Sequence, residues 1–477
     1  MTPQARMRAN ILGAVAAGFA LCAYFVLEFP PAGSGDAPIY IELAWNWLKR
    51  GIYGFAGNGS LAPVDMRVPG YPAFLAAVFA LAGRAERTVM FAQIAVDLVT
   101  CFLIALIATR LAPVESRRRA AIAGLWLAAL CPFTANYTAV AQTETLATFL
   151  SALAILVLLS SDLGRAKPIP SEFAPAKGGL SPWFLAGVIT GFGTLVRPET
   201  PLLLLAAGLA LLAKWWHPAD WRKLLRASVL MGIGLVLPLL PWAARNWTTL
   251  HKVQFLSPRY SELPGEQPPV GFSAWTRTWL WRFRDVYLVP WKLDDEEISM
   301  DDIPASAFDS AQERARVADL LEVYNDTLTL SPNQNRELGR LARERTGRHP
   351  LRTYLKIPLL RSLTLWFTPR VELLPYSGHL WPIGAQWEDD PVDFSVTLAF
   401  FMLSAAYVAL ALAGAWLARG RPGWALLIAF IAVRTLFLAT FADAPEPRYV
   451  LECFPAILAL TAQVFVRRRQ LSSTGSG

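Results

Sequence analysis

Residues 393–418 read DFSVTLAFFMLSAAYVALALAGAWLA, and after Asp393 the stretch has no charged side chain. About 20 consecutive apolar residues are enough for a helix to cross the hydrocarbon layer of a bilayer. Similar runs occur through most of the chain, which is 54% hydrophobic and only 17% charged. A soluble protein would carry about a quarter charged residues. The sequence therefore predicts an all-α polytopic membrane protein.

Hydropathy and helical periodicity predict about ten spans. Two further apolar stretches, 71–83 and 357–367, are short and are expected to lie at the interface or to re-enter; as spans they would raise the count to eleven or twelve. The predicted spans are 9–28, 88–110, 120–135, 144–160, 182–197, 200–214, 227–244, 393–418, 422–441 and 447–466.

The basic residues predict the orientation, because Lys and Arg are retained on the cytoplasmic side. With both termini cytoplasmic, the basic flanks fall inside, and the short exported loop 136–143 has no Lys or Arg. The formal charge of +8 then reflects the following flanks: Arg6, Arg8, Arg117, Arg118, Arg119, Arg165, Lys167, Lys177, Arg222, Lys223, Arg226, Arg419, Arg421, Arg467, Arg468 and Arg469. The apolar run 11–29 could be a signal peptide, but its length favours an uncleaved first helix.

This topology divides the chain into four parts. Residues 1–244 form a membrane module that contains a first exported loop at 29–87. Residues 245–391 form a larger exported region with helical patterns at 305–324 and 333–346 and an amphipathic stretch at 350–367. Residues 392–470 hold the last spans, and 471–477 are expected to be a disordered tail.

The first exported loop contains the candidate catalytic residue Asp36. It precedes an amphipathic helix in which Tyr40, Leu43 and Trp47 share the apolar stripe and Asn46 lies on the polar face. Asp is a good N-cap, so a capping role is one interpretation. The other is that an ionised carboxylate at the membrane surface accepts a proton from an attacking hydroxyl or amine.

Several other polar groups are predicted at the exported ends of the spans. Arg67, Arg197, Arg245 and Arg448 are each explained by anchoring to lipid headgroups, but together they could form a cationic pocket for a lipid phosphate. Glu144 opens the fourth predicted span. It could bind the acceptor or a divalent metal, or it could complement the dipole of its own helix.

The remaining motifs exclude other classes of site. The sequence has no Walker loop and no GxGxxG in a strand context, so no nucleotide site is predicted. No zinc-finger spacing or basic stripe indicates nucleic acid. The acidic run at 294–302 lacks EF-hand spacing. The cysteines Cys22, Cys101, Cys131 and Cys453 fall in or beside apolar runs and are interpreted as small hydrophobic residues. No cofactor follows from the sequence beyond an optional divalent metal.

An ordered set of short motifs resembles the GT-C membrane glycosyltransferases, in the branch of the protein O-mannosyltransferases and bacterial aminoarabinose transferases. The matching pieces cover most of the membrane body. They are Gly35-Asp36 through Tyr40, Arg67-Val68-Pro69-Gly70-Tyr71-Pro72, Gln142-Thr143-Glu144, Gly193 through Glu199, Leu240-Pro241-Trp242 with Arg245-Asn246, and Pro447-Arg448-Tyr449.

The resemblance implies a GT-C-like bundle and transfer of a sugar from a polyprenyl-phosphate-linked donor to a lipid, glycan or protein acceptor on the exported side of a bacterial inner membrane. It implies Asp36 as the catalytic residue. Beside it, the residues predicted at the same surface or within the matching motifs are candidates for binding the substrate and its phosphate: Arg67, Tyr71, Arg197, Arg245, Arg448 and Tyr449. Asp36 is flanked by Gly35 and Ala37 rather than forming an Asp-Glu pair, which is a departure from the protein mannosyltransferases. The alternative functions are a lipid or glycan transporter without covalent chemistry and a non-catalytic scaffold.

Overall fold

The structure is a computed structural model that describes residues 2–29, 35–57, 60–164, 180–215, 217, 220–260 and 267–466. It is almost wholly helical, with one two-stranded hairpin in the described residues. The expected tail at 471–477 and the basic flanks at 165–177 and 467–469 lie outside the described residues.

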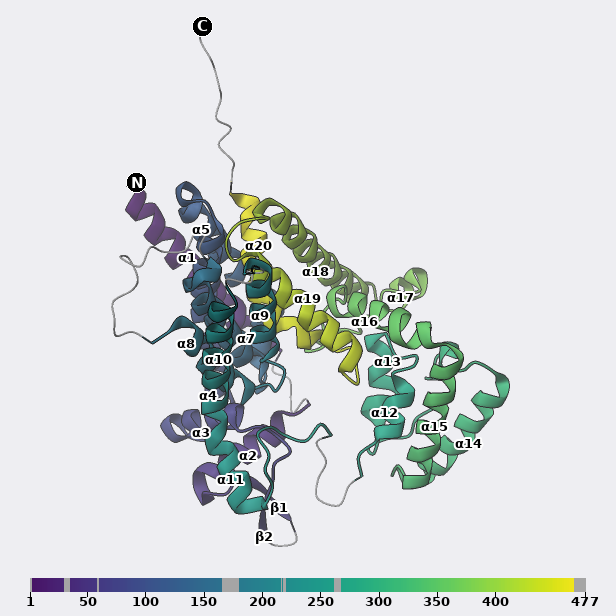
Figure 1. Cartoon of the computed structure of the whole chain (residues 1–477). Coiled ribbons are helices and arrows are strands. Elements are labelled where there is room, and N and C mark those ends of the chain that lie inside the picture. The colour runs from purple at the N-terminus through teal and green to yellow at the C-terminus, as the bar shows by residue number, and fades with distance from the viewer. Residues whose placement is uncertain are drawn as a thin grey trace.

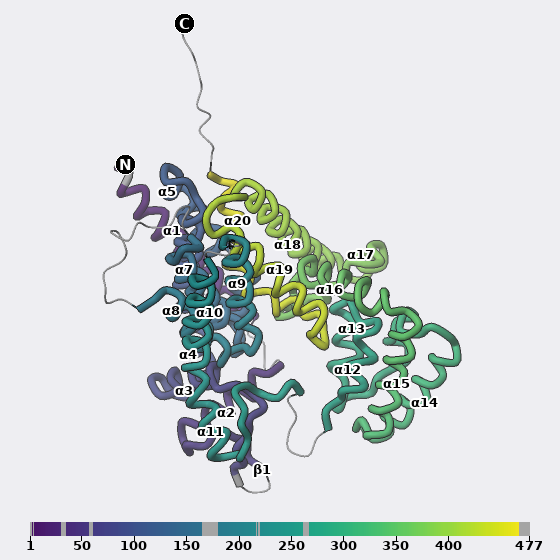
Figure 2. Tube along the Cα trace, viewed as in Figure 1, coloured from purple at the N-terminus to yellow at the C-terminus, as the bar shows by residue number. Residues whose placement is uncertain are grey.

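The membrane body gathers the long apolar helices into one bundle (Figure 1). The start of α1 and the end of α20 lie at one end of it, and α2, α3, α11 and the hairpin lie at the other (Figure 2). Its helices are α1 (Pro3–Glu28), α4 (Glu86–Leu111), α5 (Arg117–Ala129), α6 (Pro132–Ala135), α7 (Glu144–Ser160), α8 (Pro182–Thr194), α9 (Leu202–Lys214), α10 (Trp221–Val236), α11 (Leu240–Leu250), α18 (Pro391–Ala418), α19 (Trp424–Phe441) and α20 (Phe454–Thr461).

Six helical segments in the described part are long and apolar enough to span a membrane, and the bent pair Val114–Ala129 and Pro132–Ala139 makes a seventh. Three of the ten predicted spans are shorter helices: α7, α8 and α9 have 17, 13 and 13 residues. Prolines explain the early breaks, because a proline has no backbone N–H and ends a helix that precedes it. Pro198 and Pro201 separate α8 from α9, and Pro132 follows the kink after α5.

The segment predicted as the first exported loop contains two helices and the hairpin. These are α2 (Ala37–Arg50), β1 (Gly54–Gly57), β2 (Ser60–Pro63) and α3 (Gly70–Ala82). The helix that was predicted after Asp36 is confirmed, but its faces differ in two places. Asn46, expected on the polar face, is buried because its amide donates to the Gly54 carbonyl at 2.9 Å. Trp47, expected on the apolar stripe, is 37% exposed.

The segment predicted as the larger exported region forms a second helical group beside the membrane body (Figure 1). We refer to it, by its predicted location, as the exported helical group. It comprises α12 (Val270–Thr276), α13 (Phe283–Leu288), α14 (Ala311–Thr327), α15 (Pro332–Arg348), a π turn at Arg352–Lys356, α16 (Ile357–Trp366) and α17 (Ile383–Asp389). Its own apolar core includes the fully buried Trp275 and Trp279. The helices that were predicted at 305–324 and 333–346 correspond to α14 and α15.

Short one-turn helices complete the fold. They are η1 (Val114–Ser116), η2 (Asn136–Ala139), η3 (Asp162–Gly164), η6 (Leu237–Leu239), η7 (Pro290–Lys292), η8 (Ala305–Ala307), η10 (Pro447–Cys453) and η11 (Ala462–Phe465). The four cysteines are free and buried, which agrees with their interpretation as small hydrophobic residues.

Candidate active site

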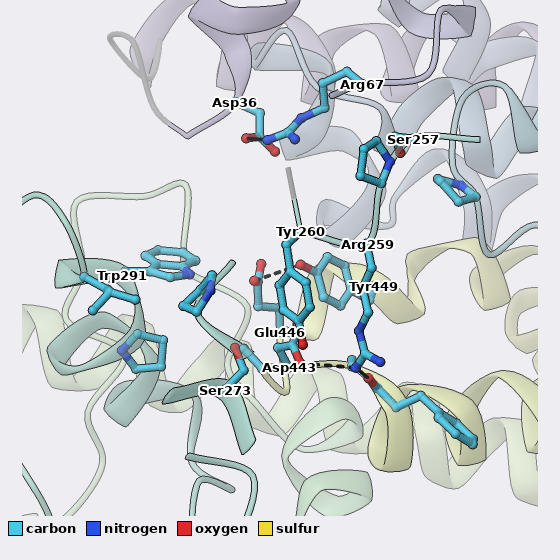
Figure 3. Close-up of a pocket in the computed structure, with 18 of the residues that line it drawn as sticks. Asp36, Arg67, Ser257, Arg259, Tyr260, Ser273, Trp291, Asp443, Glu446 and Tyr449 are labelled. Atoms are coloured by element: carbon cyan, nitrogen blue, oxygen red, sulfur yellow. Dashed lines mark hydrogen bonds and ion pairs between the residues drawn. The ribbon is translucent and has the colours of Figure 1, made fainter. Parts of the chain in front are cut away.

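A cavity of about 1780 Å³ lies between the end of the membrane body that carries α2 and the second helical group. Figure 3 shows Asp36 and Arg67 on one wall and Trp291 with Ser273 on the opposite side. Six of the eight predicted site residues line this cavity: Asp36, Arg67, Glu144, Arg197, Arg448 and Tyr449.

The Asp36 carboxylate is paired with the Arg67 guanidinium. Arg67 Nη2 donates to Asp36 Oδ1 at 2.8 Å, and the two side chains keep 19% and 33% of their surfaces exposed. Asp36 stands at the N-cap position of α2, but its side chain accepts no capping hydrogen bond from the helix. The capping interpretation is therefore wrong, and the carboxylate points into the cavity instead.

The turn that carries Arg67 is held against the end of α8. The Gly70 N–H donates to the Leu195 carbonyl at 2.6 Å, and a Cβ on Gly70 would lie only 2.4 Å from that oxygen. Tyr53 donates its hydroxyl hydrogen to the Arg67 carbonyl at 2.9 Å. The glycine in the RVPGYP stretch is thus required for close backbone contact, and this contact fixes where Arg67 projects.

Opposing effects set the pKa of Asp36. Burial raises it, but the positive charges of Arg67, Arg448 and Arg197 and the hydrogen bond from Arg67 lower it by more. The net result is a pKa below the usual 3.8. Asp36 is therefore ionised at physiological pH, and it is a weak base for as long as Arg67 remains bound to it.

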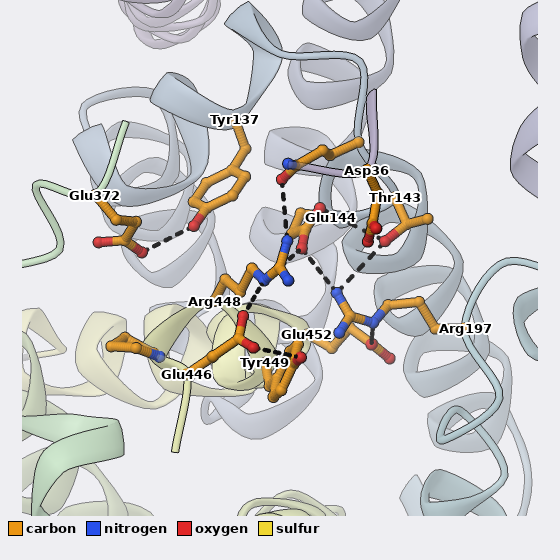
Figure 4. Close-up of polar contacts among 12 residues, drawn as sticks. Asp36, Tyr137, Thr143, Glu144, Arg197, Glu372, Glu446, Arg448, Tyr449 and Glu452 are labelled. Atoms are coloured by element: carbon orange, nitrogen blue, oxygen red, sulfur yellow. Dashed lines mark hydrogen bonds and ion pairs between the residues drawn. The ribbon is translucent and has the colours of Figure 1, made fainter. Parts of the chain in front are cut away.

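A second group of charges surrounds Glu144 (Figure 4). Arg197 Nη1 donates to Glu144 Oε1 at 2.9 Å, and Arg448 Nε lies 3.9 Å from the same oxygen. The local pair of Arg197 with Glu199 is longer, at 3.9 Å. Glu144 is only 3% exposed, so its main partners are these two guanidiniums.

Two carboxylates that no motif assigned a role complete this group. Glu446 accepts from Arg448 Nε at 2.6 Å and from the Tyr449 hydroxyl at 2.8 Å. Glu452 Oε1 contacts Arg434 Nη2 at 2.5 Å and Arg197 Nε at 3.3 Å. The sequence did carry a signal for Glu452, because a carboxyl inside the apolar run 447–466 needs a partner.

Two of the predicted substrate-binding residues do not line the cavity. Tyr71 is fully buried and donates its hydroxyl hydrogen to Gln93 at 2.8 Å. Arg245 donates to the carbonyls of Tyr53 and Val64, each at 2.8 Å. Both therefore hold the first exported loop in place rather than face the cavity.

The charged side chains that line the cavity are better suited to bind an anion than a metal ion. Asp36, Glu144, Glu446 and Glu452 are each engaged by at least one guanidinium. Those positive charges would repel a cation at the same place. Within the described ranges, no three His, Cys, Asp or Glu side chains lie close enough together to hold a metal ion.

Comparison with known proteins agrees with this architecture. The family model of dolichyl-phosphate-mannose-protein mannosyltransferases matches residues 66–242, and a search of curated proteins found no match. The archaeal oligosaccharyltransferase AglB from Archaeoglobus fulgidus, solved with an inhibitory peptide and a dolichol-phosphate, has a TM-score of 0.51 at 14% identity over 95% of this chain and 50% of its own. The apo form of the Archaeoglobus fulgidus oligosaccharyltransferase gives a TM-score of 0.48 at 15% identity, again over 95% and 50%.

This chain thus spans about half the length of the solved structures that it matches. The matched family segment contains Arg67, Glu144 and Arg197, and the structural likeness covers 95% of this chain. The resemblance inferred from the motifs is confirmed: the chain has a GT-C-like fold, and residues 66–242 match the dolichyl-phosphate-mannose-protein mannosyltransferase family.

Proposed function

We propose that this protein transfers a sugar from a polyprenyl-phosphate-linked donor to an acceptor at the exported face of the membrane. The observation that carries the proposal is the shared cavity, in which one ionised carboxylate, Asp36, faces the guanidiniums of Arg67, Arg197 and Arg448. A carboxylate can accept the proton of a nucleophile, and guanidiniums stabilise a phosphate leaving group. We also propose a bacterial inner membrane, with both termini cytoplasmic.

The lipid part of the donor would lie at the apolar rim of the cavity. This rim is formed by α9 and α19, where Leu205 is 54% and Phe441 is 60% exposed. Apolar side chains that face the bilayer beside a cationic pocket suit a prenyl chain with a phosphate at its end. The dolichol-phosphate bound to the archaeal oligosaccharyltransferase supports a lipid of this class.

The acceptor would enter from the exported helical group. The wall opposite Asp36 includes Ser273, Thr276, Tyr260 and Trp291. Hydroxyls and an exposed indole ring suit a polar acceptor that carries a hydroxyl or amine. Glu144 is a weaker candidate for binding the acceptor or an optional metal, because Arg197 already engages its carboxylate.

In the reaction, the acceptor oxygen or nitrogen attacks the anomeric carbon and forms the new bond. The bond from that carbon to the phosphate oxygen breaks, and its electron pair leaves with the polyprenyl phosphate. Asp36 accepts the proton from the nucleophile, and the displacement inverts the anomeric centre. Arg67 and Arg448 stabilise the leaving phosphate by preorganised electrostatics.

Donor binding would also activate Asp36. A phosphate competes with Asp36 for the Arg67 guanidinium, and loss of that hydrogen bond and charge allows the pKa of Asp36 to rise. A carboxylate with a higher pKa is a better general base. The donor therefore prepares the base that its own transfer requires.

The test is a transfer assay with a radiolabelled sugar lipid on the full chain in vesicles. Wild type is expected to turn over, and Asp36→Asn to lose transfer by roughly 100-fold or more, as for removal of a general base. Glu42→Gln, the same chemical change one helical turn and a half away, is the control and is expected to retain activity. Equal turnover by D36N and wild type removes Asp36 from the mechanism, and vesicle flux without transfer indicates a transporter.

A further inference from the structure

A second cavity, of about 830 Å³, lies outside the site described above. Its walls come from α12, α15, the π turn with the start of α16, and the last turn of α19. Small residues form its floor, among them Gly271, Ala274 and Gly339. Four arginines and no carboxylate belong to its lining: Arg277, Arg336, Arg343 and Arg361.

Two of these arginines are already engaged. Arg361 is 1% exposed and donates to the carbonyls of Leu280, Ala442 and Asp443. Arg277 pairs with the Asp443 carboxylate at 3.3 Å. They hold the end of α19 against α12, and they add positive charge to the cavity wall.

The other two arginines are able to bind an anionic ligand. Arg336 and Arg343 lie on α15 and are exposed. Arg336 contacts the side-chain oxygen of Asn333, and in the described part of the chain no carboxylate pairs with either arginine. The two guanidiniums therefore leave this cavity with uncompensated positive charge.

The cavity lies beside the end of a membrane span. Ala439 and Thr440, at the exported end of the span α19, form part of its wall. The adjoining segment exposes a row of large apolar side chains: Leu351 at 76%, Tyr354 at 73%, Leu355 at 55% and Leu359 at 58%. An amphipathic segment with such a face lies in the membrane interface. The cavity is thus at the depth of the lipid headgroups.

We propose that this cavity binds the phosphate headgroup of an acidic glycerophospholipid. Arg336 and Arg343 would contact the phosphate, since guanidiniums bind phosphate oxygens through two parallel hydrogen bonds. The acyl chains would lie along the exposed apolar row of residues 351–359 and along α19. This site is separate from the catalytic cavity, because α12 faces the two with different residues: Gly271 and Ala274 here, Ser273 and Thr276 there.

The experiment is native mass spectrometry of the full chain, released from micelles that contain equal amounts of phosphatidylglycerol and phosphatidylcholine. Wild type is expected to retain one phosphatidylglycerol. Each arginine near a charged membrane contributes about fivefold to such binding, so Arg336→Ala with Arg343→Ala should lower retention by roughly 25-fold. Arg314→Ala on α14, which removes one positive charge away from the cavity, is the control for the single variants Arg336→Ala and Arg343→Ala, each expected to lower retention about fivefold.

A steric variant tests the cavity without removing charge. Gly347 belongs to the lining, and a Cβ there would meet nothing within 4 Å. Gly347→Leu is therefore expected to fold and to exclude the lipid. Three results would overturn the proposal. Wild type could retain the two lipids equally, or the charge and the steric variants could both retain as much phosphatidylglycerol as wild type. The third result is displacement of phosphatidylglycerol by millimolar inorganic phosphate.

Discussion

Glu452 offers the sharpest test of how the membrane body supports the cavity. Its carboxylate is 2% exposed and lies between Arg434, which is fully buried, and Arg197. Ser151 donates a further hydrogen bond to it at 3.2 Å. Among the described residues, Arg434 pairs with no other carboxylate. Glu452 thus neutralises one structural guanidinium and positions one that lines the cavity.

The substitution Glu452→Gln keeps the shape and removes the charge. It leaves Arg434 as an uncompensated buried cation, for which removal of one partner costs about 3–5 kcal/mol. The retained contacts of Arg197 with Glu144 favour the lower end of that range. Glu199→Gln is the matched control, because Glu199 keeps 30% of its side chain exposed and lies 3.9 Å from Arg197. Its loss should cost at most about 1 kcal/mol.

The assay is denaturant unfolding in detergent micelles, with transfer activity measured in parallel. E452Q should lower the unfolding free energy by about 3 kcal/mol and should reduce transfer, because Arg197 loses a fixed partner. Adding Arg434→Met to E452Q removes the unpaired cation and should restore part of the stability. If E452Q and E199Q destabilise the protein equally, or if R434M adds to the loss, the argument from buried charge is refuted.

Further predictions follow from the first exported loop. Arg67→Gln removes a charge that lowers the pKa of Asp36, so the acid limb of the kcat/KM profile should move to higher pH, and less so in Arg67→Lys; an unmoved limb would contradict the pairing. Gly70→Ala should lower the unfolding free energy by about 1–3 kcal/mol because its Cβ meets the α8 backbone, whereas Gly208→Ala, which meets nothing within 4 Å, should not destabilise the protein. Arg245→Ala should lower the melting temperature more than it changes the KM for the donor, since Arg245 ties the carbonyls of Tyr53 and Val64 to α11 and does not line the cavity; a selective rise in KM would place it at the substrate.

Much of the fold could be predicted because its signals are local. Apolar runs, basic flanks and the helical period between residues 37 and 50 each act over one element. The predicted number of spans was less accurate, because α8 and α9 are only 13 residues long each and are separated by a turn that contains Pro198 and Pro201. Their lengths follow from packing in the bundle as well as from hydropathy.

The cavity could not be predicted from the sequence, because it depends on contacts between residues that lie far apart along the chain. The four arginines of the predicted cationic pocket were each expected at the exported side. Whether a guanidinium there faces the cavity depends on its tertiary hydrogen bonds. Arg67 and Arg448 reach the cavity, whereas Arg245 turns to backbone carbonyls of the hairpin region. Glu446 accepts from its near neighbours Arg448 and Tyr449, a contact that the spacing alone leaves open.

The most direct test of the account is a structure of the full chain with a non-hydrolysable polyprenyl phosphonate sugar. The account predicts the phosphonate within about 3 Å of the Arg67 and Arg448 guanidiniums and the prenyl chain between α9 and α19. It also predicts that the Asp36 carboxylate leaves Arg67 and faces the position from which the acceptor attacks the anomeric carbon. A phosphonate bound elsewhere, with the Asp36 to Arg67 pair intact at 2.8 Å, would contradict it.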